Sequence, residues 1–288
     1  MKKIMILAFA MLMLVGCSNG SGGSTDGENK TPSNKTLSNT EAMEFLEKAS
    51  KAFDESMIMY QEEFDAHLEF PYIENGEIKI DENQRSEVYQ VNRVNKKDAL
   101  LYEIKLSDGV EVEHISVEKY TDEKKKIGTV ESFFNSSSPD GYSISKGESI
   151  DSNFVAVNPI KLLMEDFDVY YDKYYTTKLE ETDEFYILRI NLSDVNDYNA
   201  AIIKKNGHKP YWSNEDGDKI EFDKIKEKNE YIFDKDYNLI ETHYVSAEDC
   251  GNNVIVNTKS NWKYKKIDKM KYSYEEVMEL LSQAKQAE

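Results

Sequence analysis

The sequence predicts an α+β domain in which a large, curved antiparallel sheet carries helices packed on one face. Most of the chain is a run of strand-like segments with few helices between them, whereas a parallel sheet needs a helix after most strands. The 19 tyrosines and 12 phenylalanines favour half-buried sheet surfaces. A capped amphipathic helix is also predicted at each end of the domain, which covers residues 39–288.

The first predicted element is a helix that runs to about Glu55. The sequence Ser38-Asn39-Thr40-Glu41 fits a capping box, with Ser38 as the N-cap and Glu41 reaching back to it. Apolar residues then recur at helical spacing: Met43, Leu46, Ala49 and Phe53.

A change of period then indicates strands. Residues 58–70 alternate between apolar and polar, which predicts a strand with one wet face that ends at Pro71. Asn75-Gly76 is a signal for a tight hairpin turn. Further strands are predicted at residues 88–94, 100–106, 110–120 and 127–134.

The middle of the chain mixes helices and strands. Asn158-Pro159, followed by apolar residues at helical spacing, predicts a short helix with Asn158 as its N-cap. Two strands are predicted at residues 169–179 and 186–192. A helix is predicted at residues 194–205, and Asn206-Gly207 is expected to end it.

The last third has the clearest strand pattern. Residues 229–233 and 239–245 predict a hairpin with its turn at residues 234–238. Residues 254–264 alternate between apolar and polar and predict another strand. Residues 273–287 predict a final amphipathic helix, capped by its first residue.

The N-terminal residues predict where the protein works. A basic start (residues 1–3) precedes an uncharged apolar run (residues 4–15), and small residues then lead to Cys17. This order is that of a secretory signal peptide. The run is too short for a transmembrane helix, which needs about 20 apolar residues. Secretion with full release is the alternative to anchoring.

Leu14-Val15-Gly16-Cys17 resembles the lipobox of bacterial lipoproteins, in which the cysteine is lipidated and becomes the mature N-terminus. The resemblance implies a signal peptide at residues 1–16 and a lipid-bearing Cys17. A diacylglyceryl group supplies the two chains that stable anchoring needs. Residues 17–38 then form a flexible Gly/Ser/Asn-rich tether, and the domain sits at the extracytoplasmic face of the cell membrane.

The charge balance excludes one class of partner. The chain has 36 basic and 55 acidic residues. Lys2 and Lys3 leave with the signal peptide, so the mature chain keeps 34 basic residues and a net charge of −21. Nucleic acid and anionic lipid surfaces repel such a protein. We therefore expect no nucleic-acid partner.

The sequence carries no recognised catalytic, metal or cofactor motif. The four histidines are scattered: His67, His114, His208 and His243. His67, His114 and His243 fall in strand-like stretches and are expected to be surface strand residues. Cys250 has no partner for a disulfide if Cys17 is lipidated. The sequence therefore predicts no catalytic residue, no metal site and no cofactor, with an exported enzyme as the least favoured alternative.

An apolar site is the remaining candidate. A helix across the concave face of a twisted sheet can leave an apolar pocket. Aromatic and aliphatic residues of facing parities are predicted to line it: Tyr60, Phe64, Leu68, Trp262 and Tyr264. The alternative is that these residues only form the core.

The layout is similar to that of Gram-positive lipoproteins with the LolA/LppX-like fold. The likeness rests on the lipobox, the tether, the first helix, the meander of strands and a hairpin with Asp234-Lys235-Asp236 at its turn. It covers the pattern of residues 40–265 and implies a half-barrel sheet around an apolar cavity. The expected function is a non-enzymatic, membrane-anchored lipoprotein that binds a lipid or other apolar ligand. The alternative is a structural or interaction lipoprotein of the cell envelope or spore, without a small ligand.

Overall fold

The computed structural model describes residues 33–93, 98–107, 110–122, 127–136, 142–150, 158–167, 171–213 and 217–283. Its helices are α1 (Asn39–Ser56), α2 (Pro159–Asp166), α3 (Asp172–Tyr174), α4 (Val195–Asn206) and α5 (Tyr274–Gln283). Its strands are β1 (Ser33–Thr36), β2 (Met59–Glu74), β3 (Glu77–Asn92), β4 (Asp98–Ser107), β5 (Val110–Asp122), β6 (Ile127–Ser136), β7 (Tyr142–Ile150), β8 (Tyr175–Glu181), β9 (Phe185–Leu192), β10 (Tyr211–Ser213), β11 (Lys219–Glu221), β12 (Asp223–Asp234), β13 (Leu239–Asp249) and β14 (Ile255–Lys266). The predicted signal peptide, Cys17 and most of the predicted tether lie outside the described residues.

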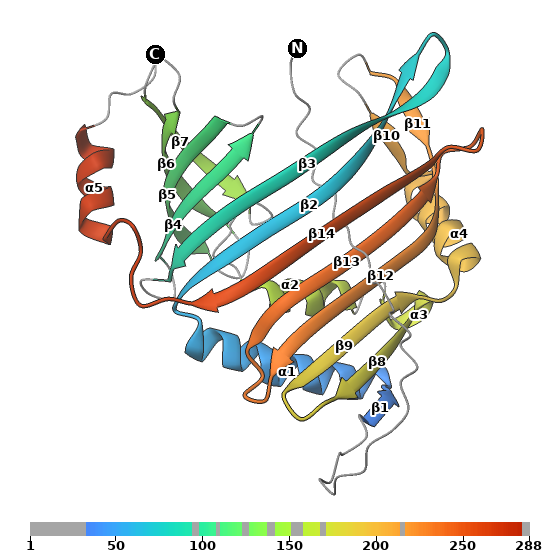
Figure 1. Ribbon diagram of the computed structural model, residues 1–288, viewed down its shortest axis with the longest axis horizontal. Helices are drawn as coiled ribbons and strands as arrows, with labels where there is room; N and C mark the ends of the chain where they lie inside the picture. The colour runs from blue at the N-terminus through green and yellow to red at the C-terminus, as the bar shows by residue number, and fades with distance from the viewer. Residues whose placement is uncertain are drawn as a thin grey trace, which may run out of the picture.

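Twelve of these described strands form one sheet in the order β1-β8-β9-β12-β13-β14-β2-β3-β4-β5-β6-β7 (Figure 1). All of its neighbouring strands run antiparallel. The predicted α+β class with an antiparallel sheet is therefore confirmed. β14 pairs with β2, so the last third of the chain lies beside its first long strand.

The β2–β3 hairpin shows one confirmed prediction and one correction. Asn75 and Gly76 have φ values of 53° and 80°, the left-handed conformations that a tight two-residue hairpin turn needs. Pro71 does not end β2, which continues to Glu74. The pairing of β14 with β2 stops at Leu68. Beyond that point β2 has an open edge, where a residue without an N–H is tolerated.

The predicted helix ends are observed. Ser38 and Glu41 form the capping box of α1, in which the Ser38 N–H donates to Glu41 Oε2 at 2.9 Å. The Ser273 N–H donates to Glu276 Oε2 at 2.7 Å at the start of α5. Gly207 has φ 78° and ends α4. These caps satisfy backbone groups that the helices leave unpaired.

Several elements differ from the predictions. β1 pairs with β8, which places residues 33–36, within the segment predicted as a tether, in the sheet. The predicted strand at residues 169–179 is wrong in part, because α3 precedes β8. β7 and the small β10–β11 hairpin were not predicted. β1, β10 and β11 have only three or four residues, which is too short to show a hydrophobic period.

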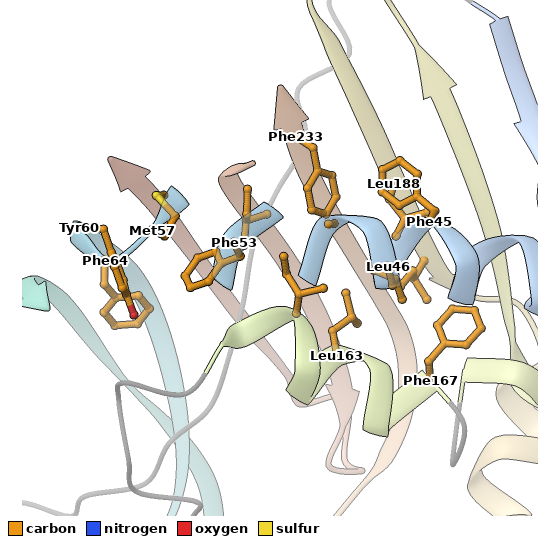
Figure 2. Packing of buried hydrophobic residues seen from close by; sticks show 14 of the residues in the cluster. Phe45, Leu46, Phe53, Met57, Tyr60, Phe64, Leu163, Phe167, Leu188 and Phe233 are labelled. Carbon is orange, nitrogen blue, oxygen red and sulfur yellow. The ribbon is translucent and has the colours of Figure 1, made fainter. Parts of the chain in front are cut away.

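Helix α1 crosses one face of the sheet, which we call the inner face (Figure 1). Phe45 of α1 packs edge-on against Phe233 of β12, with ring centroids 5.1 Å apart. Leu163 of α2 and Phe167, the C-cap of α2, belong to the same cluster (Figure 2). Each fully buried side chain of this size contributes roughly 1.5–3 kcal/mol to stability, so this cluster holds the two helices on the sheet.

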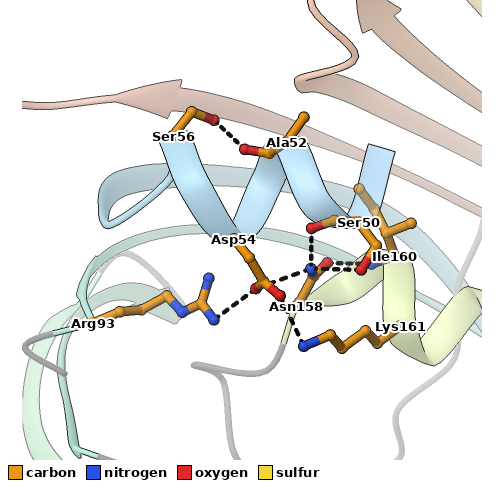
Figure 3. Close-up of polar contacts among 8 residues, drawn as sticks. All are labelled: Ser50, Ala52, Asp54, Ser56, Arg93, Asn158, Ile160 and Lys161. Carbon is orange, nitrogen blue, oxygen red and sulfur yellow. Dashed lines mark hydrogen bonds and ion pairs between the residues drawn. The ribbon is translucent and has the colours of Figure 1, made fainter. Parts of the chain in front are cut away.

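A polar network also joins α1 and α2 to Arg93, the residue that follows β3 (Figure 3). Asp54 forms ion pairs with Arg93 and Lys161, each at 2.8 Å. Burial acts to raise the pKa of Asp54, but the hydrogen bonds from Lys161 and Arg93 outweigh it and hold that pKa below its usual value. Asn158 donates to the Ser50 carbonyl at 3.0 Å and caps α2, which orients α2 against α1.

Helix α5 makes a smaller contact elsewhere on the sheet. Its Val277 is buried in a cluster with Ile115 and Val117 of β5. None of the helices in the described part of the chain is long and apolar enough to cross a membrane.

Candidate functional site

The five residues that the sequence suggests for a ligand site lie in one place on the inner face. Tyr60, Phe64 and Leu68 come from β2, and Trp262 and Tyr264 come from β14. Trp262 is paired directly with Phe64 across the two strands, and their ring centroids are 4.3 Å apart. All five belong to the main apolar cluster. Their proximity is observed, and their binding role stays a prediction.

Two of these side chains, Tyr60 and Tyr264, are packed under α1. Tyr60 is 0% exposed and Leu68 is 3% exposed. Phe53 of α1 contacts the rings of Tyr60 and Tyr264, at centroid distances of 5.3 and 6.4 Å. The helix therefore covers the part of the inner face that carries these tyrosines.

Tyr89 of β3 completes the aromatic group, although the sequence analysis did not single it out. Its ring is stacked on Trp262, with centroids 5.9 Å apart and planes inclined by 26°. Tyr89 lies opposite Glu62 in the β2–β3 pairing. A strand was predicted here, but the order of strands in the sheet was not, so the contact with Trp262 could not be seen.

Glu62 is the second feature that sequence reasoning missed. It lies on the inner face between Tyr60 and Phe64, and it is 5% exposed. Within the described residues its carboxyl forms no hydrogen bond or ion pair. Burial raises its pKa to about 8, because a carboxylate without a partner is disfavoured away from water. The sequence did contain a signal for this residue, because Glu62 is an acid at a strand position that shares the face of the apolar residues Tyr60 and Phe64.

The adjacent acid, Glu87 of β3, has the partners that Glu62 lacks. It is paired with Phe64 across the strands and is buried. Arg85 forms an ion pair with one of its carboxyl oxygens, and the Tyr89 hydroxyl donates to the other. The Arg85 guanidinium also lies 6.0 Å from the Phe64 ring centroid. Of the two neighbouring inner-face acids, Glu87 therefore has a cationic partner and a hydrogen-bond donor, and Glu62 has neither among the described residues.

A second buried polar group lies further along the same face. Lys224 Nζ is 2.6 Å from Glu227 Oε2 and 3.8 Å from Glu248 Oε1. Trp212 Nε1 donates to the other oxygen of Glu248 at 3.0 Å. Burial acts to lower the pKa of Lys224, but Tyr244, Glu227 and Glu248 reverse this and raise it. Lys224 therefore remains charged between two acids.

The backbone of β12 places this lysine. A β-bulge interrupts the pairing with β13 between Lys224 and Lys226. Asn199 of α4 satisfies the Lys224 backbone there, because its Nδ2 donates to the Lys224 carbonyl at 2.9 Å and its Oδ1 accepts from the Lys224 N–H at 3.0 Å. A bulge re-aims the side chain it carries, and α4 holds this one in place.

The described residues offer little for catalysis. They contain no group of three or more His, Cys, Asp or Glu side chains arranged to hold a metal ion. His243 lies 3.1 Å from Glu241. Cys250 is buried, and burial with the nearby Glu248 and Asp249 raises its pKa to about 11. Such a thiol stays protonated and is a poor nucleophile.

Comparisons with known proteins add little. No protein-family model and no curated protein matches the chain. Among solved structures, the chain is similar to a DUF1329 family protein from Desulfovibrio piger, with 13% sequence identity and a TM-score of 0.32. The similarity covers 83% of this chain and 98% of that chain. This likeness is too remote to indicate a fold or a function.

Proposed function

We propose that this protein is a lipid-anchored extracytoplasmic binding protein that holds a lipid or another apolar ligand between its sheet and α1. The anchor is the lipidated Cys17, and the ligand site is the aromatic part of the inner face. Its role is non-enzymatic, without a cofactor.

The observation that carries the proposal is the convergence of aromatic rings from four elements. Trp262 of β14 contacts Phe64 of β2 in a tilted pair and Tyr89 of β3 in a stacked pair. Phe53 of α1 packs edge-on against Tyr264. Aromatic side chains supply large apolar surfaces of defined geometry. Pockets for small ligands are lined mainly by such residues.

The proposed arrangement is a half-barrel of the LolA/LppX type, with the helices on its concave face. The antiparallel sheet with α1 and α2 on one face supports this arrangement. Phe53 and Tyr60 are fully buried between α1 and the sheet. We therefore infer that a ligand enters as α1 moves away from β2.

Ligand recovery tests the proposal. Residues 18–288, which contain every described residue, are measured by native mass spectrometry before and after organic extraction. We expect a co-purifying mass of lipid size that extraction removes. The Trp262→Ala variant should show no co-purifying lipid mass. The control variant Trp212→Phe, which changes the other tryptophan, should still show it. A bare protein that also binds no lipid probe would contradict the proposal.

A structural or interaction lipoprotein is the second candidate. The tight packing of Tyr60 and Leu68 favours it, because a filled core needs no ligand. An acidic surface would then meet a partner protein of the cell envelope or spore. Pull-down from envelope extracts should recover a specific partner, and its absence would count against this candidate.

The anchor has a separate test. Cys17→Ser should move the protein from the membrane fraction to the medium, or leave it unprocessed. A Cys17→Ser protein that is processed and stays on the membrane would show that the lipobox interpretation is wrong.

A further inference from the structure

The immediate surroundings of Glu62 are aromatic on every side within the sheet. Residues two apart on a strand share a face, which places Tyr60 and Phe64 beside Glu62. The strand pairings place Tyr89 of β3 and Tyr264 of β14 directly opposite it. Directly paired residues have Cβ atoms about 5 Å apart. Four aromatic residues are therefore the nearest same-face neighbours of Glu62 in the sheet.

A carboxyl within aromatic rings is complementary to an organic cation. The face of an aromatic ring attracts a cation within about 6 Å of its centroid, and quaternary ammonium groups are recognised in this way. A carboxylate adds a full opposite charge in surroundings that screen it weakly. An uncharged or anionic group gains neither interaction.

The neighbouring acid shows that the chain can supply a cation where it needs one. Glu87 pairs with Arg85, and Arg85 also lies against the Phe64 ring. Glu62 has no such partner among the described residues. The cost of burying an acid without a partner is large, and a cation from outside the chain would offset it.

We propose that Glu62 binds the ammonium group of a cationic amphiphile, whose apolar chain lies along Phe64, Trp262 and α1. The inference rests on the proposed function and names the ligand class of that site. Glu62 is 5% exposed, so the ligand reaches it by displacing the side chains above it.

Binding of the cation is coupled to a proton. Burial raises the pKa of Glu62 to about 8, so the carboxyl is mostly protonated at pH 7 and gives its proton to the buffer when the ammonium group binds. The titratable or charged groups that face it among the described residues are Tyr60 on β2, Tyr89, Glu87 and Arg85 on β3, and Tyr264 on β14. α1 packs here through the uncharged Phe53.

The experiment uses the full chain carrying Cys17→Ser and isothermal titration calorimetry. The probes are dodecyltrimethylammonium, neutral dodecyl maltoside and dodecyl sulfate, each below its micelle-forming concentration. At pH 8 we expect the cation to bind at least tenfold more tightly than the neutral probe. Its affinity should fall about 50-fold between pH 8 and pH 6, because the carboxyl must first lose a proton. Buffers of different ionisation enthalpy should show proton release at pH 7.

Glu62→Gln should remove the preference for the cation, the pH dependence and the proton release. The matched control is Glu63→Gln, which removes the same charge from the exposed neighbour on the opposite face and should keep all three. The control also accounts for non-specific attraction of the cation to an acidic protein. If Glu62→Gln fails to fold, the proton release of the unsubstituted chain still tests the idea.

The outcomes separate the two proposals. Equal affinity for the cationic and neutral probes, or no effect of Glu62→Gln, would overturn the role of Glu62 and leave an apolar ligand site in place. Binding of none of the probes would overturn both.

Discussion

Glu62 and Glu227 are buried to the same degree on the same face of the sheet, 5% and 6% exposed, but their surroundings differ. Glu227 has Lys224 at 2.6 Å, whereas the residues paired directly with Glu62 on the two neighbouring strands are Tyr264 and Tyr89. One acid has a cationic partner, and burial raises the pKa of the other to about 8. At equal burial, the two acids therefore differ in whether the chain places a cation beside them.

Removing the cation from the network should have the largest effect. Lys224→Met leaves Glu227 and Glu248 buried without a counter-charge, and we expect a loss of about 3–5 kcal/mol in the free energy of unfolding. Chemical denaturation measures it. Lys235→Met, at an ion pair with the more exposed Glu181, should cost less than about 1 kcal/mol. Equal losses of stability in the two variants would contradict the larger contribution expected from the buried Lys224 network.

The pH dependence of stability sharpens the comparison. The pKa of Glu62 rises from 4.5 to about 8 on folding, so the folded state keeps a proton that the unfolded chain releases. Stability is then complete below pH 4.5, falls as the pH rises toward 8, and levels off above it. Between pH 5 and pH 8, the free energy of unfolding of Glu62→Gln should rise relative to that of the unsubstituted chain by about 1.4 kcal/mol for each unit of increasing pH. Urea denaturation across this pH range measures the difference in the free energy of unfolding. In the control variant Glu63→Gln, this difference should not change with pH.

An uncharged buried group gives an intermediate case. Asn158 is buried and donates to Ser50 while it accepts from the Ile160 N–H at 3.0 Å. Asn158→Ala removes the cap of α2 and should cost about 1–3 kcal/mol. Asn158→Ser keeps a capping oxygen and should recover part of the loss. Thermal and chemical denaturation compare the two, and an identical loss would assign the effect to packing.

The smallest effect is expected at the partly exposed ion pair. Lys161 and Asp54 have side chains that are 53% and 31% exposed. Lys161→Ala should therefore cost only about 0.5 kcal/mol, since water screens the pair and Arg93 remains. High salt should remove most of that difference. A loss as large as that of Lys224→Met would show that exposure does not separate the two networks.

Much of the local structure was predictable. The capping boxes at Ser38 and Ser273, the Asn75-Gly76 turn and the parity of β2 all follow from residues within a few positions of each other. The grouping of Phe64 with Trp262 was anticipated from parity. Glu62 was passed over because it stands at an apolar position, and Lys224 because a bulge changes its register.

The sequence by itself determined the caps of α1 and α5, the Asn75-Gly76 turn and the face on which β2 carries its apolar residues, because these depend on contacts within a few residues. The expected lipid anchor at Cys17 comes from the same kind of local pattern. Only the tertiary structure decided that β14, β2 and β3 are neighbours. That order places Tyr264 and Tyr89 on either side of Glu62 and pairs Lys224 with Glu248. Such pairings join residues far apart in the chain, and no local period records them.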